Sequence, residues 1–91
     1  MLPRITPIQQ SGDYKTGSLS GLLSVSMLTN ILGFPPNLQG DAEKVTYEWG
    51  FNIGEHRCGV WDYKGNRWST FGNHGALEAL FRELYTGEGR L

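Results

Sequence analysis

VTYEWGFNIGEHRCGVWDYKGNRWSTFG, residues 45–72, carries the clearest secondary-structure pattern in the chain. It contains all three tryptophans and seven of the eleven aromatic residues of the chain. Its first half alternates apolar and polar residues as far as Ile53, which is the period of a strand with one buried face. Gly54-Glu55 then fits a two-residue type II′ turn, because glycine suits the first central position of that turn. We therefore expect a β-hairpin with strands at about 43–53 and 57–63.

The length of the turn decides which side chains share a face of this hairpin, because a slip of one residue turns every side chain over. A two-residue turn sets Ile53 opposite His56, Phe51 opposite Cys58, and Trp49 opposite Val60. The face expected to form the core then carries Val45, Tyr47, Trp49, Phe51, Ile53, Cys58 and Val60. The opposite face carries Thr46, Glu48, Asn52, Arg57, Trp61 and Tyr63.

Helical patterns lie on either side of the hairpin. Ser24 as an N-cap and the stop signal Gly33 before two prolines predict a helix over 25–32. Asn73 caps a second predicted helix over 74–86. We expect an extended arm over 1–17 with one short edge strand, short strands near 18–23 and 68–71, and a flexible tail over 88–91. The predicted fold class is α+β, a small antiparallel sheet with two helices packed on one face.

Size and charge narrow the possible functions. Ninety-one residues predict a single domain over 1–91. A net charge of −1 argues against binding of long nucleic acids, which need a strongly positive surface. The single cysteine, Cys58, permits no intramolecular disulfide and favours a reducing cytosol. The most apolar window, residues 19–34, is interrupted by polar residues and is too short to span a membrane.

The second half of the 45–72 stretch carries the candidate binding site, in which aromatic and basic residues alternate around a predicted turn at residues 64–67. Flat rings offer stacking platforms for a nucleobase, and nearby cations can hold phosphates. The alternative is that these aromatic residues complete the small core or form a dimer interface. The predicted ligand-binding residues are Trp61, Tyr63 and Trp68 for stacking, Lys64, Arg67 and Arg57 for phosphates, and Asn66 and Thr70 for orientation.

Other chemistry is not expected. His56 and Cys58 form an H-x-C pair, but a zinc site needs about four ligands, so we predict no metal and no cofactor. No nucleophile and base stand at a recognisable spacing, so we predict that the protein is not an enzyme. The segment 72–75 opens the second predicted helix. Because a helix N-terminus attracts anions, this segment is a candidate anion site, and the alternative is that it is an ordinary helix cap.

Several short motifs resemble a group of small bacteriophage-encoded proteins. They are RITPIQ at residues 4–9, EWGF at 48–51, WDYKG at 61–65, WSTFG at 68–72 and the closing helix ALEALF at 76–81. Together they cover most of the chain, and the segment 13–15 departs from the pattern.

The resemblance implies an anti-defence setting in the host cytosol. The leading hypothesis is a non-enzymatic protein that sequesters a cyclic or other small nucleotide signal, as an oligomer of at least two chains. The alternatives are an inhibitor that binds a host defence nuclease or Cas complex, and a structural or regulatory accessory protein without a ligand.

Overall fold

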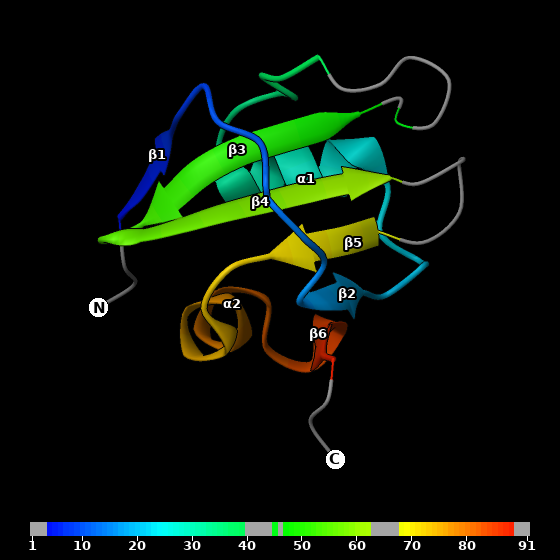
Figure 1. The fold of residues 1–91 in the computed structure, drawn as a ribbon. Coiled ribbons are helices and arrows are strands. Elements are labelled where there is room, and N and C mark those ends of the chain that lie inside the picture. The colour runs from blue at the N-terminus through cyan, green and yellow to red at the C-terminus, as the bar shows by residue number, and fades with distance from the viewer. Residues whose placement is uncertain (1–3, 40–44, 46, 63–67, 89–91) are drawn as a thin grey trace.

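A six-stranded antiparallel sheet and two helices make up the computed structural model, which describes residues 4–39, 45, 47–62 and 68–88 (Figure 1). The strand order is β1-β3-β4-β5-β2-β6. This is the α+β fold class expected from the sequence. The elements in chain order are β1 (Ile5–Pro7), β2 (Gly17–Leu19), α1 (Val25–Leu32), β3 (Glu48–Ile53), β4 (His56–Asp62), β5 (Trp68–Phe71), α2 (His74–Phe81), the 3₁₀ turn η1 (Arg82–Leu84) and β6 (Tyr85–Gly87).

The central hairpin β3–β4 has the predicted register. Trp49 pairs with Val60, Phe51 with Cys58, and Ile53 with His56. Gly54 has φ 59°, the left-handed value that the first central position of a type II′ turn requires. The first predicted strand is too long, because β3 begins at Glu48, whereas β4 begins one residue earlier than predicted, at His56. Residues 43, 44, 46 and 63 lie outside the described part of the chain.

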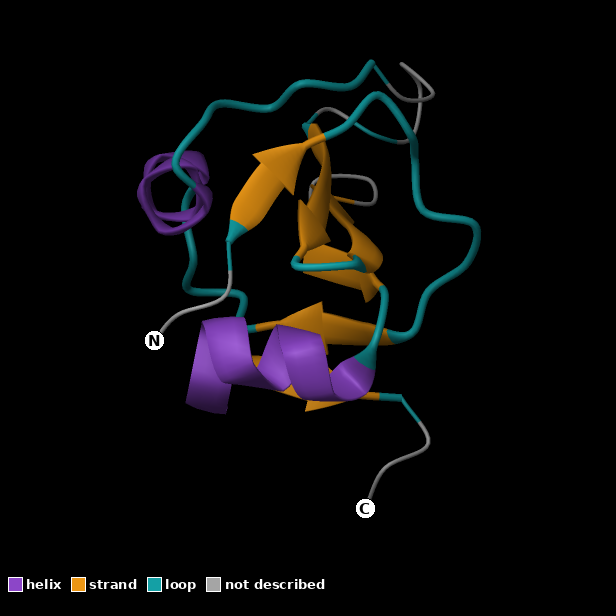
Figure 2. Ribbon diagram, turned by 90° about the vertical axis from the view of Figure 1, so that its left-hand side faces the viewer, coloured by secondary structure: helices purple, strands orange, loops and turns teal. Residues whose placement is uncertain are grey.

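Local sequence signals set the helix boundaries. The Ser24 hydroxyl accepts the Met27 N–H at 3.1 Å, and Gly33 ends α1 in the left-handed conformation with φ 92°. The Asn73 side chain caps α2 by accepting the Ala76 N–H at 2.9 Å. Both helices pack on one face of the sheet, as the views in Figures 1 and 2 show.

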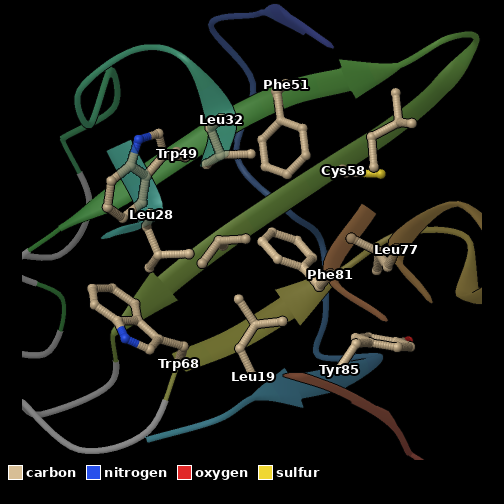
Figure 3. Packing of buried hydrophobic residues seen from close by; sticks show 12 residues of the cluster. Leu19, Leu28, Leu32, Trp49, Phe51, Cys58, Trp68, Leu77, Phe81 and Tyr85 are labelled. Carbon is tan, nitrogen blue, oxygen red and sulfur yellow. The ribbon is translucent and has the colours of Figure 1, made fainter. Parts of the chain in front are cut away.

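The core lies between that face and the helices (Figure 3). The indoles of Trp49 and Trp68 meet edge to face, with ring centroids 5.7 Å apart. Each indole N–H is satisfied by a backbone carbonyl, that of Phe34 for Trp49 at 2.9 Å and that of Leu23 for Trp68 at 2.7 Å. The buried cluster is Leu19, Leu28, Leu32, Trp49, Phe51, Ile53, Cys58, Val60, Trp68, Leu77, Phe81 and Tyr85.

The C-terminal region differs from the prediction of one helix over 74–86. The helix α2 ends at Phe81 because Arg82 adopts φ 54° and ψ −127°, a backbone conformation outside the helical region. Tyr85 then pairs with Leu19 in the sheet and buries its ring there. Glu88, predicted to open a flexible tail, donates its N–H to the Thr16 carbonyl at 2.8 Å. Residues 89–91 lie outside the described residues.

The predicted core face of the hairpin also ends earlier than expected. Tyr47 is 41% exposed, and Val45 is only half-buried, so the buried run begins at Trp49. At the N-terminus, Ile5–Pro7 forms the expected edge strand, paired with β3. In the described ranges no helix is long and apolar enough to cross a membrane.

Candidate functional site

The face of the sheet away from the helices is crossed by the chain's own residues 8–16, here called the strap (Figure 1). Ile8 donates its N–H to the Gly50 carbonyl at 3.0 Å. The Asn37 side chain joins the strap to β3, because its amide donates to the carbonyls of Ile8 and Gly50 and its oxygen accepts the Gly50 N–H at 2.9 Å. Gly50 and Gly59 leave room for the strap, since a Cβ on Gly50 would lie 2.8 Å from the Ile8 carbonyl oxygen and one on Gly59 would lie 3.4 Å from the Gly12 nitrogen.

Arg57 projects from β4 on the strap side and is held at three points. One guanidinium nitrogen donates to the Ser11 carbonyl at 2.8 Å. The other pairs with the Asp13 carboxylate. The guanidinium also lies over the Phe71 ring, 4.8 Å from its centroid, in a cation–π contact.

A second aromatic ring completes this cluster. The Tyr14 ring stands edge-on to Phe71 with centroids 5.2 Å apart, while Tyr14 itself is 66% exposed. Register explains why Phe71 faces the strap: it pairs with Gly59, which lies on the same face as Arg57. Two aromatic rings and one cation therefore gather at the end of the strap.

These residues border a solvent-open hollow of about 370 Å³. We call it the Arg57 hollow, and it lies between the strap, the β3–β4 turn and the start of α2. Its volume falls within the roughly 300–1,000 Å³ of sites that take small molecules. The lining residues are Tyr14, Thr16, Glu55, His56, Arg57, Phe71, Gly72 and Asn73.

Two predicted ligand contacts belong to the core instead. Trp68 is 6% exposed, and Thr70 is fully buried. Trp68 pairs with Asp62 in the β4–β5 register, while Trp61 pairs with Ser69. Trp61 and Trp68 therefore lie on opposite faces of the sheet and cannot form one stacking platform. The alternative that aromatic residues complete the small core holds for Trp68.

Of the remaining predicted contacts, Trp61 and Arg57 lie in the described part of the chain. Trp61 is half-buried beneath the strap, since a Cβ built on Gly12 would lie 3.0 Å from its ring. Arg57 lines the hollow, as a phosphate-holding residue should. Tyr63, Lys64, Asn66 and Arg67 lie outside the described residues.

Sequence reasoning missed Tyr14, Phe71 and Asn73 as partners of Arg57. Tyr14 lies 43 positions before Arg57, and Asn73 opens a different element, so no local period connects them. The one usable signal is the set of glycines, because positions 12, 50 and 59 all sit where two backbones approach closely.

Two buried titratable groups, Cys58 and Glu48, have shifted pKa values. Burial raises the pKa of the Cys58 thiol to about 11, although backbone N–H groups of Asn73 and Ile53 oppose the shift. Burial also raises the pKa of Glu48, and a hydrogen bond from the Ser11 side chain partly offsets this. Within the described residues no three His, Cys, Asp or Glu side chains come together as a metal site.

A second hollow, of about 450 Å³, lies at the far end of the sheet beside β2, η1 and β6. Leu22 on its rim is 90% exposed, and Leu84 is 37% exposed. Its described lining residues provide hydroxyl groups and the Glu83 carboxylate but no cation.

Comparison with known proteins identifies no relative. No protein-family model matches the chain, and neither a curated protein nor a solved structure does.

Proposed function

We propose that this chain is a non-enzymatic binding protein that sequesters a small nucleotide-derived signal in the Arg57 hollow, in a phage-type anti-defence role. The observation that carries the proposal is the convergence of a cation and two aromatic rings, Arg57, Tyr14 and Phe71, on one hollow of nucleotide size. The host bacterial cytosol is the proposed location, in keeping with the single reduced cysteine.

The chemistry of the hollow supports a ligand with a base and a phosphate. Exposed rings such as that of Tyr14 stack on any base, at about 1–3 kcal/mol per base. A guanidinium matches phosphate oxygens with two parallel hydrogen bonds. The backbone at Gly72 and Asn73 adds the start of α2, whose positive dipole end favours anions.

The absence of catalysis is likewise proposed, and two groups support it. Cys58 is fully buried, and a thiol with its pKa at about 11 is almost wholly protonated at neutral pH. Glu48 is buried beneath the strap, away from the hollow. Neither group lines the Arg57 hollow.

We further propose at least a dimer. The hollow is open to solvent, and a ligand within it would keep one side in water. A second chain would cover that side and increase the buried surface, because sites that hold small ligands tightly enclose most of the ligand.

A second candidate function, inhibition of a host defence nuclease or Cas complex by direct binding, is favoured by the second hollow. Leu22 projects almost entirely into solvent there, beside the exposed Leu84. Exposed apolar side chains next to a hollow are typical of protein-binding surfaces.

Thermal-shift measurements against cyclic di- and trinucleotides, cyclic ADP-riboses and mononucleotides test the first proposal. A ligand at about 100 times its Kd adds roughly 2.7 kcal/mol to the free energy of unfolding. For a domain of this size that is about 10 °C or more in Tm. Arg57→Gln should lose the shift, and Arg82→Gln, which removes the same charge at the distant end of α2, should keep it.

Recovery of the ligand completes the test. Intact ligand released after denaturation supports sequestration, whereas a chemically altered ligand shows an enzyme. If no compound raises Tm, the nucleotide proposal is wrong and the protein-binding candidate takes its place.

A further inference from the structure

The guanidinium of Arg57 is already occupied by acceptors of its own chain. One terminal nitrogen donates a hydrogen bond to the Ser11 carbonyl, and the other donates to the Asp13 carboxylate. Phe71 covers one face of the group. A phosphoryl group arriving in the hollow therefore meets an arginine whose anion position is filled.

The ion pair between Asp13 and Arg57 is weak enough for a ligand to displace the Asp13 carboxylate. Its side chain is 60% exposed, and exposed ion pairs of this kind are weak because water and salt screen them. The second ion pair of this segment, Lys15 with Glu88 at 3.6 Å, is also exposed on both sides.

The segment that carries Asp13 is fixed on both sides. Before it, Gly12 lies so close to Phe71 and Trp61 that a Cβ there would lie 2.5 Å from the Phe71 Cβ and 3.0 Å from both rings. After it, Thr16 donates its N–H to the Thr70 carbonyl at 2.7 Å. The exposed Asp13 side chain can therefore turn away from Arg57 while Tyr14 keeps its contact with Phe71 and the strap keeps its place on the sheet.

We propose that Asp13 holds the position on Arg57 that a phosphoryl group of the ligand takes, and so determines which anions the hollow accepts. This inference rests on the proposed function and specifies its phosphate subsite. The ligand class is a compound with at least one phosphoryl dianion or a diphosphate, attached to a ring that reaches Tyr14.

Tethering explains the selectivity. A carboxylate on a short tether has an effective concentration in the millimolar range, so a free monocarboxylate competes poorly for the same arginine. A phosphoryl group carries up to two charges and three acceptor oxygens, which match the guanidinium fork better than one carboxylate does. The Asp13 carboxylate therefore excludes simple carboxylates and yields to phosphates.

The test is a calorimetric titration with inorganic pyrophosphate and with acetate. The proteins are the wild type, Asp13→Asn, Arg57→Gln and the matched control Glu55→Gln, which removes another carboxylate from the rim of the hollow. Asp13→Asn should bind pyrophosphate roughly fivefold more tightly than the wild type, the factor that an exposed ion pair contributes. It should also gain measurable acetate binding. Arg57→Gln should bind neither anion.

The outcomes separate this inference from the proposed function. If Glu55→Gln tightens binding as much as Asp13→Asn, only the net charge of the rim matters, and the role of Asp13 is overturned. If the wild type binds a nucleotide in the thermal-shift panel but Asp13→Asn binds pyrophosphate no more tightly, the inference fails while the proposed function stands.

If Asp13→Asn gains pyrophosphate binding but no nucleotide binds either protein, the subsite stands and the proposed function fails. If Asp13→Asn binds no pyrophosphate at all, the inference is overturned. Urea unfolding of Asp13→Asn provides the control for folding, and we expect a midpoint close to that of the wild type because the side chain is exposed.

Discussion

Gly50→Ala should destabilise the protein because the strap lies directly on β3 at this glycine. A Cβ built on Gly50 would lie 2.8 Å from the carbonyl oxygen of Ile8 and closer still to that of Gln10. It would also lie 2.8 Å from a methyl group of Leu38. Two of these three neighbours are backbone atoms of the strap, so they cannot move aside as a flexible side chain would.

Two effects of opposite sign decide the magnitude. Alanine restricts the unfolded chain more than glycine does, which stabilises the folded state by about 0.4–1 kcal/mol where the conformation is compatible. Forcing an extra methyl group into a packed site costs about 1–3 kcal/mol. The clash is the larger effect here because the strap must lift from the sheet to relieve it. We expect a net loss of about 1–2 kcal/mol in the free energy of unfolding.

Urea denaturation followed by tryptophan fluorescence measures this loss, with Gly21→Ala as the matched control. A Cβ at Gly21 has no neighbour within 4 Å, so that variant should be as stable as the wild type or slightly more stable. If Gly50→Ala proves as stable as Gly21→Ala, the strap does not rest on β3 and the description of the site is wrong.

Three further predictions concern buried side chains. Trp68→Ala should lower the free energy of unfolding, measured with urea, by about 3–5 kcal/mol because a core indole is lost. A variant of near-wild-type stability would show that Trp68 is not part of the core. Burial raises the pKa of Glu48 in the folded state above its value in the unfolded state. The protonated carboxyl therefore favours the folded state at acidic pH, and this stabilisation is lost as pH rises through the raised pKa. Glu48→Gln should therefore gain stability over the wild type at neutral pH and less at acidic pH, and a pH-independent difference would contradict this. Cys58, with its pKa at about 11, should react with a thiol reagent at pH 8 at least roughly 100-fold more slowly in the folded than in the unfolded protein, and equal rates would show an accessible thiol.

Local patterns in the sequence were sufficient to predict the hairpin and α1. The alternation up to Ile53 and the glycine of the turn fix the β3–β4 register without help from the rest of the chain. Ser24 and Gly33 bound α1 through contacts within four residues. Such short-range signals can be read directly from a single sequence.

The strap and the C-terminal strand could not be predicted in the same way. Arg57 contacts Asp13, which lies 44 positions earlier in the chain, and the spacing of the two residues does not predict this contact. The second helix ends early because Tyr85 gains a strand partner in β2 and buries its ring against the core. In each case a long-range contact decides the conformation of a segment whose local pattern allows more than one.

The placement of Trp68 shows how one register decides a site. Aromatic composition grouped it with Trp61, but adjacent strands of a sheet share a face only at paired positions. Trp68 pairs with Asp62, one position beyond Trp61, so its indole enters the core. The candidate site therefore centres on Arg57, the one predicted phosphate contact among the described residues.

An NMR titration of ¹⁵N-labelled protein with ADP, the simplest ligand that joins an adenine base to a diphosphate, tests directly whether the Arg57 hollow binds nucleotides. We expect saturable shifts of the amide signals of Tyr14, Arg57 and Asn73, which all line the same hollow. The signals of Leu22 and Leu84, at the second hollow, should stay in place. Saturable shifts confined to Leu22 and Leu84, or no shifts at all, would contradict the claim that the Arg57 hollow binds nucleotides.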